Sequence, residues 1–332
     1  MLVSQVVVRI TSQRGGPTEE ALRSHMPGGR LIHGDIRFTV MDEPADVVVV
    51  INYLKYDAVI RSRSGYVWNW HNEPIVRQPF GRGFDRVFTH QESRDPRTVK
   101  SPPILDWWLQ KSWDELDSME PPSKSKPASL IASTKKMIEG HRRRNEFVSL
   151  VEEALPEVSV FGEGRPKTLD DKWTGLSTFR YSIAIENSSK LDYWTEKISD
   201  CFLAYTVPFY FGARNIGDYF PRDSFIWLPL DNPERAVQII RETINGDSWE
   251  ARLPALAEAR RLALHDYSLF GQITSRVRQE RDTILAAPWE SRRIHGRRTR
   301  PGGWIRGIGF WGNLQNQSQK IESRLSRTSD PK

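Results

Sequence analysis

The sequence has one cysteine, Cys201, and no long apolar run. A single thiol excludes an internal disulfide and a cysteine-based zinc site, and it is typical of a reducing compartment. The longest apolar run, ADVVVVI at residues 45–51, is far shorter than the roughly 18 to 20 residues that a membrane-spanning helix needs. The first ten residues lack a basic region, an apolar signal core and a small-residue cleavage site. We therefore expect a cytoplasmic protein with neither a span nor an export signal.

The length of 332 residues exceeds the roughly 100 to 200 residues of one domain. Hydrophobic residues make up 38% of the chain, enough for folded cores and too many for a disordered chain. A stretch dense in proline, serine and charge, EPPSKSKP, is typical of a linker. We predict an amino-terminal domain (1–115), a linker (116–127), a carboxy-terminal domain (128–290) and a basic tail (291–332).

The net charge of +6 is unevenly distributed along the chain. Residues 291–332 contain ten Lys or Arg and two acidic residues, a net charge of +8, so the other 290 residues together have a net charge of −2. A nearly neutral body differs from a nucleic-acid-binding domain, whose basic residues cover a folded face. We therefore expect no nucleic-acid partner.

The apolar pattern predicts an α/β fold in both domains. Continuous Val- and Ile-rich segments, as at 45–53, are typical of strands that are covered on both faces. In the second domain, short strands at 181–185 and 207–211 flank a segment with helical spacing at 195–204, which predicts a β-α-β crossover. Ligands of such parallel sheets bind at the carboxyl ends of the strands.

Polar residues gather where that crossover helix begins, in the sequence ENSSKLDYWTEK from Glu186 to Lys197. A helix amino terminus favours phosphate, and Lys197 adds a positive charge, so a diphosphate would be stabilised there. Glu196 would accept hydrogen bonds from two ribose hydroxyls, as acidic residues do in nucleotide-binding sheets. The alternative is that Thr195 and Glu196 only cap the helix and that Lys197 is a solvated surface charge.

A second cationic group, HRRRN, occurs at residues 141–145. If both strand-helix units belong to one parallel sheet, Arg144 and Lys197 approach the same edge and could bind a pyrophosphate from two sides. Three consecutive arginines are also typical of a solvated helix start, which remains the alternative.

The stretch from Tyr181 to Leu228 resembles the signature region of the glycosyltransferase family 10 fucosyltransferases. That pattern has a strand, ENS or ENT, a spacer, Y-x-T-E-K, a helix, and then VP and G; here it is ENSSKLDYWTEK followed by Val207, Pro208 and Gly212. The segment ASLIASTKKMIEGHRRRNEF is similar to the family's strand, Ser-rich loop and R-N before a helix. The resemblance is strongest over residues 128–230.

This resemblance implies the GT-B architecture, with two Rossmann-like domains that face each other across a cleft, the first for the acceptor and the second for the donor. It also implies an inverting transfer of fucose from GDP-fucose to a hydroxyl of a saccharide, such as a surface glycan. By resemblance, Arg144 and Lys197 bind the diphosphate, Glu196 binds the ribose, and Asn187 and Tyr193 line the donor site.

Inversion requires a general base opposite the leaving group. The family has a glutamate in a loop after a first-domain strand, and Glu73 follows the predicted strand Tyr66–Trp70, so Glu73 is the candidate. The family order in this loop is G-E-N, whereas this chain has His71, Asn72 and Glu73, so His71 is the rival. Glu73 as an ordinary surface acid is the third possibility. No Asp-x-Asp pair stands where it could bind a sugar-nucleotide metal, so we expect no cofactor and no essential metal.

Aromatic residues are frequent, with twelve tryptophans. Aromatic faces stack on sugar rings, and Trp68 and Trp70 precede the Glu73 loop, so they are the candidates for acceptor contact. The basic tail also contains Trp304 and Trp311. Cations beside aromatics favour peripheral contact with an anionic inner membrane face, whereas the many tail glycines favour a flexible segment in solution. Both interpretations stay open.

Overall fold

The computed structural model describes residues 4–12, 17–73, 83–104, 106–134, 139–246 and 249–296, with side chains omitted at 139–141. The described chain forms two compact units. The first contains residues up to 104, 112–114 and those from 272 on, and the second contains 105–111 and 115–271. Within the described ranges, no helix has the length and apolar character needed to cross a membrane.

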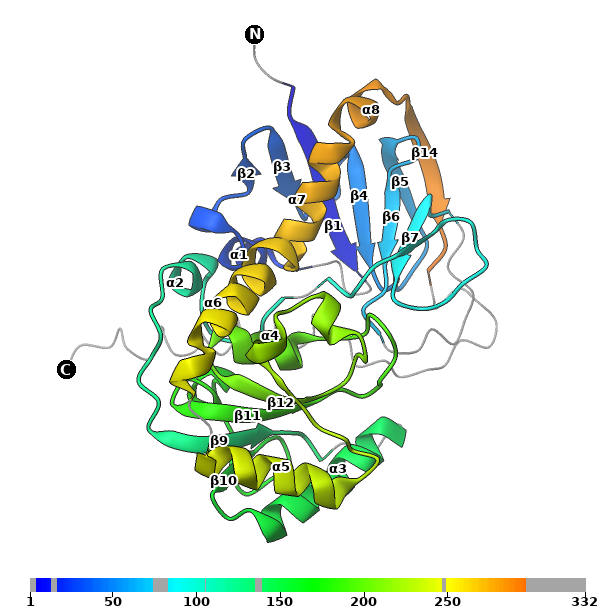
Figure 1. Ribbon diagram of the computed structural model, residues 1–332. Helices are drawn as coiled ribbons and strands as arrows, with labels where there is room; N and C mark the ends of the chain where they lie inside the picture. Colours follow the sequence, from blue (N-terminus) through cyan, green and yellow to red (C-terminus); the bar gives the residue numbers. More distant parts are fainter. Residues whose placement is uncertain are drawn as a thin grey trace, which may run out of the picture. The chain divides into compact units, whose positions relative to one another are not determined.

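The first unit is built on a seven-stranded sheet with the order β2-β3-β1-β4-β6-β7-β8 (Figure 1). All neighbours pair in parallel except β2 and β3. The strands are β1 (Val6–Ser12), β2 (Ile32–His33), β3 (Ile36–Thr39), β4 (Val47–Ile51), β6 (Val67–Trp70), β7 (Arg86–Thr89) and β8 (Thr98–Lys100). Every residue of the central strand β4 is buried, as its unbroken Val and Ile run predicts for a strand covered on both faces.

The end of the described chain completes the first unit. Helices α7 (Leu269–Gln279) and α8 (Arg281–Ala286) lie beside its sheet, and the Tyr66 hydroxyl donates to Thr283 Oγ1 at 3.1 Å. Strand β14 (Trp289–Ile294) pairs antiparallel with β5 (Ala58–Arg63), and the side chain of Ile294 is buried in an apolar cluster with Ile60 and Val67. The helix α1 (Glu19–Ser24) follows β1.

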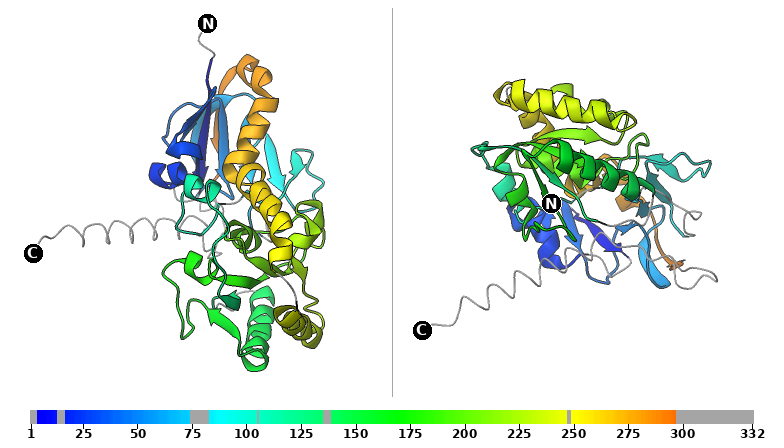
Figure 2. Two further views of the ribbon diagram at one scale, coloured as in Figure 1. Left: turned by 60° about the vertical axis from the view of Figure 1, so that its left-hand side comes forward. Right: turned by 90° about the horizontal axis from the view of Figure 1, so that it is seen from below.

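The second unit has a five-stranded parallel sheet with the order β10-β9-β11-β12-β13. Its strands are β9 (Lys126–Ile131), β10 (Val158–Phe161), β11 (Phe179–Ile185), β12 (Val207–Phe211) and β13 (Ile226–Trp227). Helices α3 (Glu139–Ala154) and α5 (Pro233–Gly246) lie side by side on one face, as Figures 1 and 2 show. Helices α4 (Glu196–Leu203) and α6 (Leu253–Arg261) contact each other, and α4 packs on β11 and β12.

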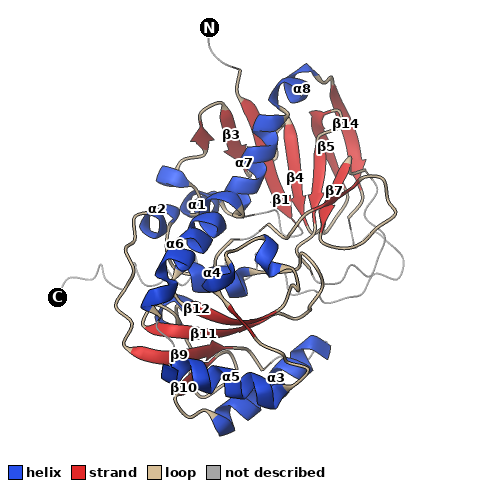
Figure 3. Cartoon of the chain, in the orientation of Figure 1, coloured by secondary structure: helices blue, strands red, loops and turns tan. Residues whose placement is uncertain are grey.

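Strands and helices alternate along much of the second unit, and both units are built on sheets that are wholly or mainly parallel; strands are coloured red in Figure 3. The predicted α/β class is therefore confirmed. The crossover predicted at 181–211 is β11, α4 and β12, with the helix ends displaced by a single residue.

The compact units differ from the predicted boundaries at the carboxy-terminal end. Residues 272–290 were assigned to the second domain, but they pack with the first unit, and residues 291–294 of the predicted tail form β14. The reason is that burial alternates along β14 and ends at fully buried Ile294, so the segment supplies an edge strand despite its arginines. The predicted linker contains the end of α2 (Trp113–Asp117) and the start of β9. The tail from residue 297 lies outside the described residues.

Candidate active site

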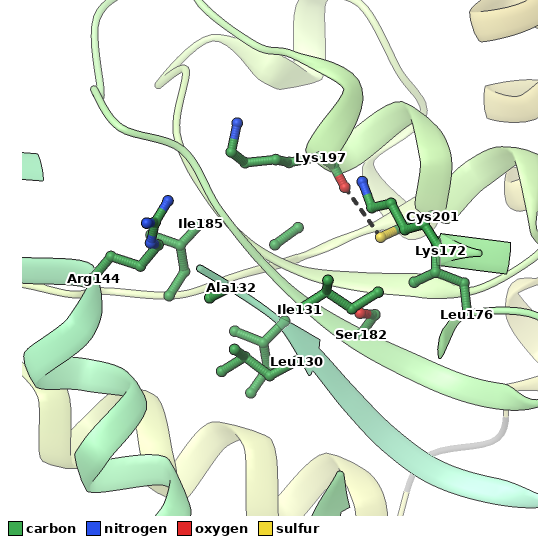
Figure 4. Close-up of a pocket in the computed structure, with 12 residues that line it drawn as sticks. Leu130, Ile131, Ala132, Arg144, Lys172, Leu176, Ser182, Ile185, Lys197 and Cys201 are labelled. Atoms are coloured by element: carbon green, nitrogen blue, oxygen red, sulfur yellow. Dashed lines mark hydrogen bonds between the residues drawn. The ribbon is translucent and has the colours of Figure 1, made fainter. Parts of the chain in front are cut away.

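The candidate site lies in the second unit, at the carboxyl ends of β9 and β11 and at the start of α4. Because β9 and β11 are parallel neighbours, the residues that follow them emerge at the same edge of the sheet. Ser133 follows β9, and Glu186 and Asn187 follow β11. Arg144 of α3 and Lys197 of α4 reach the same edge (Figure 4).

The amino terminus of α4 is held in place by a buried glutamate. Thr195 is the N-cap, with extended φ and ψ of −136° and −173°. Glu186 accepts hydrogen bonds from the backbone N–H of Thr195 at 2.7 Å and from its hydroxyl at 2.8 Å. The Glu186 side chain is completely buried, and burial raises its pKa, against the opposing charge of Lys197. Sequence reasoning listed Glu186 with the polar cluster but gave it no role; a glutamate directly after a buried strand was the available signal.

Gly212 is required because the chain passes very close to that glutamate. A Cβ at Gly212 would lie 2.6 Å from Glu186 Cγ and 2.1 Å from the hydroxyl oxygen of Tyr210. Both neighbours are buried, so neither has room to move aside. The glycine of the predicted VP-and-G pattern therefore makes room for the glutamate that organises the helix start.

Lys197 lies between two carboxylates. Its Nζ is 3.4 Å from Glu186 Oε2 and 3.3 Å from Glu196 Oε1, and its side chain is 24% exposed. Burial opposes the ammonium charge, but the two carboxylates outweigh it and raise the pKa of Lys197 above its usual value. Burial also opposes ionisation of Glu196, yet the nearby lysines leave its pKa lowered. Both groups are therefore charged at neutral pH.

Arg144 is the second cation of this edge and is buried. Its Nη1 donates to Asn187 Oδ1 at 3.1 Å, and its Nη2 donates to the carbonyl of Ser133 at 3.2 Å. The guanidinium thus connects the ends of β9 and β11. Burial, followed by the charge of Arg165, lowers its pKa, and Glu186 acts in the opposite direction.

A cavity opens between these cations and the face of the sheet (Figure 4). Its lining includes the apolar side chains of Leu130, Ile131 and Ile183, while Arg144 and Lys197 lie toward one end. The cavity reaches Lys172 and Cys201 at the other end, where the Cys201 thiol donates to the carbonyl of Lys197 at 3.2 Å. An apolar pocket with a few convergent cations is suited to an anionic ligand.

The loop before α4 is held to the next crossover. Asp192 adopts a positive φ of 60° and accepts hydrogen bonds from Asn215 Nδ2 at 2.7 Å and from the Tyr219 hydroxyl at 2.6 Å. The backbone N–H of Asp192 donates back to Asn215 Oδ1 at 2.8 Å. These bonds fix the chain just before Tyr193 and the helix start.

The structure brings four predicted residues, Arg144, Asn187, Glu196 and Lys197, to one edge of one sheet. Of these four, Arg144 and Lys197 line the cavity, whereas Asn187 and Glu196 do not. Tyr193 is in the same loop, is only 2% exposed and does not line the cavity either. The donor contacts of all five residues stay predictions. Sequence reasoning did not name Lys172, which lines the cavity although it precedes β11 by seven residues; no local pattern marks it.

The remaining candidates lie in the first unit. Glu73 follows β6 and is exposed, and His71 is buried; the loop beyond residue 73 lies outside the described residues. The expected acceptor contact of Trp68 and Trp70 is not supported, because both side chains are completely buried. Trp70 stacks on Phe88 with ring centroids 4.2 Å apart, and Arg276 lies over both rings. These two tryptophans are part of the core, which the aromatic count alone does not distinguish from sugar binding.

The sequence comparison matches the part of the chain that forms the site. Residues 121–240 match the family model described as "Glycosyltransferase family 10 (fucosyltransferase) C-term". Residues 121–240 therefore belong to glycosyltransferase family 10 by sequence. The resemblance predicted over residues 128–230 is therefore confirmed, and the matched region contains Arg144, Asn187, Tyr193, Glu196 and Lys197.

Two curated relatives are fucosyltransferases. The chain is 30% identical over 191 residues to the "4-galactosyl-N-acetylglucosaminide 3-alpha-L-fucosyltransferase 9" of Rattus norvegicus. This match covers 53% of this chain and 48% of the relative. It is 32% identical over 91 residues to the protein of the same name from Mus musculus, which covers 26% of this chain and 25% of the relative. The chain thus matches about half of the first relative's length and a quarter of the second's.

A solved structure supports the fold. The structure described as "Crystal Structure of alpha1,3-Fucosyltransferase with GDP-fucose" has a TM-score of 0.51 at 18% identity, and the match covers 86% of this chain and 92% of that one. The likeness identifies the fold of two Rossmann-like units as GT-B, as the family 10 resemblance implied.

Proposed function

We propose that this protein is a glycosyltransferase that moves fucose from GDP-fucose to a hydroxyl of a saccharide acceptor, with inversion at the anomeric carbon. The observation that supports it most is the pair of cations, Arg144 and Lys197, at one sheet edge inside the region that matches family 10. The curated relatives with fucosyltransferase names agree with this choice of donor sugar.

The second unit supplies groups suited to a nucleoside diphosphate. The start of α4 presents backbone N–H groups and the positive end of its dipole, and Lys197 and Arg144 add two cations. In the proposed complex Glu196 accepts hydrogen bonds from the ribose hydroxyls, and Asn187 and Tyr193 complete the donor site. In the proposed complex the apolar lining of the cavity lowers the dielectric around the cations, which strengthens their attraction for phosphate oxygens.

The leaving diphosphate gains negative charge as the bond to the sugar stretches. Cations that are held in place before the reaction therefore stabilise the transition state more than the bound donor. A charge-assisted hydrogen bond contributes about 1.5–3 kcal/mol, which corresponds to a ten- to hundred-fold change in rate when it acts only in the transition state. This division of labour needs no metal ion, and we propose that none is essential.

The proposed general base is Glu73, which removes the proton of the acceptor hydroxyl as GDP departs. It follows β6 at the carboxyl end of a parallel strand, the position where α/β sheets place ligand-binding groups, and its side chain is exposed. His71, two residues before it, is buried, which favours Glu73 over its rival.

We further propose an acceptor class and a site of action. A saccharide of the cell surface fits a fucosyltransferase, and the basic tail would bring a cytoplasmic enzyme to anionic lipid at the inner membrane face. The tail is tested by vesicle sedimentation of the full chain with and without residues 297–332.

A donor assay tests the function. GDP release is measured from GDP-fucose, GDP-mannose and GDP-glucose, with wild type, Lys197→Ala and Glu73→Ala, and with Glu92→Ala as the matched control because Glu92 is an exposed acid of the same unit. We expect turnover of GDP-fucose, a loss of at least ten-fold in Lys197→Ala, no transfer but intact GDP binding in Glu73→Ala, and no change in the control. Turnover of another GDP-sugar alone would assign a different donor, and GDP binding without any turnover would indicate a non-catalytic binding protein.

A further inference from the structure

Lys172 is a third cation of the cavity, and the functional roles given above do not use it. It begins a short 3₁₀ turn, Lys172–Gly175, whose N-cap Asp171 accepts a hydrogen bond from the backbone N–H of Trp173 at 2.8 Å. The Lys172 side chain is 18% exposed and lines the cavity at the end opposite Arg144.

The partner of Lys172 is a completely buried carboxylate of α4. Lys172 Nζ lies 2.7 Å from Asp200 Oδ2. Asp200 also accepts the backbone N–H of Trp108 at 3.2 Å, so its position is fixed from a second segment of the same unit. Burial raises the pKa of Asp200 to about 6, and the charge of Lys172 acts in the opposite direction. Removal of the lysine would therefore make ionisation of the buried Asp200 costly.

Asp200 is also one helical turn beyond Glu196. Residues four apart lie on the same face of a helix, so Lys172, which pairs with Asp200, lies next to the turn that carries Glu196 without forming an ion pair with it. Burial opposes ionisation of Glu196, and the charges that favour it come first from Lys197 and next from Lys172. Lys172 is thus the second cation that acts on Glu196.

The ammonium groups of Lys172 and Lys197 would have different partners when a donor binds. Lys197 is only 3.3 Å from Glu196, but a diphosphate at the start of α4 would compete for the same ammonium group. Lys172 is held by Asp200 at the far end of the cavity and has no such competitor among the described groups. Glu196 would therefore keep Lys172 as its cation while Lys197 serves the phosphates.

We propose that Lys172, anchored by Asp200 one helical turn from Glu196, is a positioning residue whose charge keeps the Glu196 carboxylate available to the ribose hydroxyls while Lys197 binds the diphosphate. The inference rests on the proposed use of a GDP-sugar and adds the residue that separates ribose recognition from phosphate binding.

The test measures binding of three probes by isothermal titration calorimetry: GDP, 2′,3′-dideoxy-GDP, which has no ribose hydroxyls, and inorganic pyrophosphate. Wild type should bind GDP about ten-fold more tightly than dideoxy-GDP. Lys172→Met should weaken GDP by about ten-fold and leave dideoxy-GDP and pyrophosphate within about two-fold. Lys172→Arg, which keeps the charge, should restore part of the preference for GDP.

Two further variants make the test specific. Glu196→Gln should show the same selective loss, and combining it with Lys172→Met should add nothing, because both changes act on one contact. Lys167→Met is the matched control, since Lys167 is an exposed lysine of the same unit that does not line the cavity, and it should bind all three probes as wild type does. Should Lys172→Met fail to fold because Asp200 is left unpaired, Lys172→Met combined with Asp200→Asn removes that charge and should give the same selective loss.

The outcomes separate this inference from the proposed function. If wild type prefers GDP and Lys172→Met keeps that preference, the inference is wrong and the donor proposal stands. An equal loss for all three probes also overturns it, because Lys172 would then bind phosphate or support the fold. Equal binding of GDP and dideoxy-GDP by wild type removes the ribose role of Glu196 and the inference with it. No binding of GDP by wild type contradicts the proposed function and this inference together.

Discussion

Replacement of Lys197 by methionine tests the electrostatic design of the site in the absence of any ligand. Methionine keeps much of the length and packing of the side chain but removes the charge that lies 3.4 Å from Glu186 and 3.3 Å from Glu196. Glu186 is completely buried, so after the substitution its carboxylate must either stay charged without its cation or take up a proton. The expected result is a loss of stability that depends on pH.

The magnitude follows from the burial of the pair. Breaking a buried ion pair by removal of one partner costs about 3–5 kcal/mol, and the 24% exposure of Lys197 places the expected cost near 3 kcal/mol at pH 8. Burial already raises the pKa of Glu186, and loss of Lys197 raises it further. A raised carboxyl pKa means that the folded state binds the proton more readily than the unfolded state, so the variant regains stability as the pH falls. We expect the cost to shrink to about 1 kcal/mol at pH 5.5.

The assay is urea unfolding followed by far-UV circular dichroism at pH 8 and pH 5.5, for wild type, Lys197→Met and the exposed control Lys190→Met. The control should stay within about 0.5 kcal/mol of wild type at both pH values. Lys197→Met combined with Glu186→Gln should recover much of the lost stability at pH 8, because the completely buried Glu186 is then uncharged and only Glu196 has lost its ion-pair partner. A cost that is the same at both pH values, or no cost at pH 8, would refute this account of Glu186 and Lys197.

Three further substitutions test individual contacts. Arg144→Lys keeps the charge but loses the fork that joins Asn187 to Ser133, so the affinity for GDP in calorimetry should fall about ten-fold, while Arg142→Lys at an exposed position of the same helix should change nothing. Gly212→Ala places a Cβ against Glu186 and Tyr210 and should lower the free energy of unfolding by about 1–3 kcal/mol; an unchanged urea midpoint would show that the two side chains can move aside. Asn215→Ala removes two of the three bonds that hold Asp192 and leaves the one from Tyr219; it should weaken GDP binding about three- to ten-fold with the fold intact by circular dichroism, whereas unchanged affinity would mean that this loop needs no such support.

The parallel cores were predictable because their strands are unbroken apolar runs. The run at 45–51 became β4, and the segment from Tyr181 to Phe211 became β11, α4 and β12. The strands that were missed, such as β5 and β14, are edge elements with alternating or charged residues, and only their antiparallel pairing makes them strands. Sequence spacing does not encode a partner more than two hundred residues away.

The site was predictable where its residues follow one strand or begin one helix. Asn187, Glu196 and Lys197 share the crossover of β11 and α4, and Arg144 was placed by the inference that β9 joins the same sheet. Glu186 and Lys172 have roles that depend on burial and on charges from several segments, which a local pattern does not contain. Trp68 and Trp70 show the converse, since a residue type that suits sugar binding is here part of a core.

The central claim is that Arg144, Lys197 and the start of α4 bind the diphosphate of a nucleotide. It is tested most directly by calorimetric titration of wild type and Lys197→Met with GDP, GMP and guanosine under one set of conditions. The account predicts that wild type binds GDP at least ten-fold more tightly than GMP, and that Lys197→Met abolishes this difference. Equal affinity of wild type for GDP and GMP, or an undiminished preference for GDP in the variant, would contradict it.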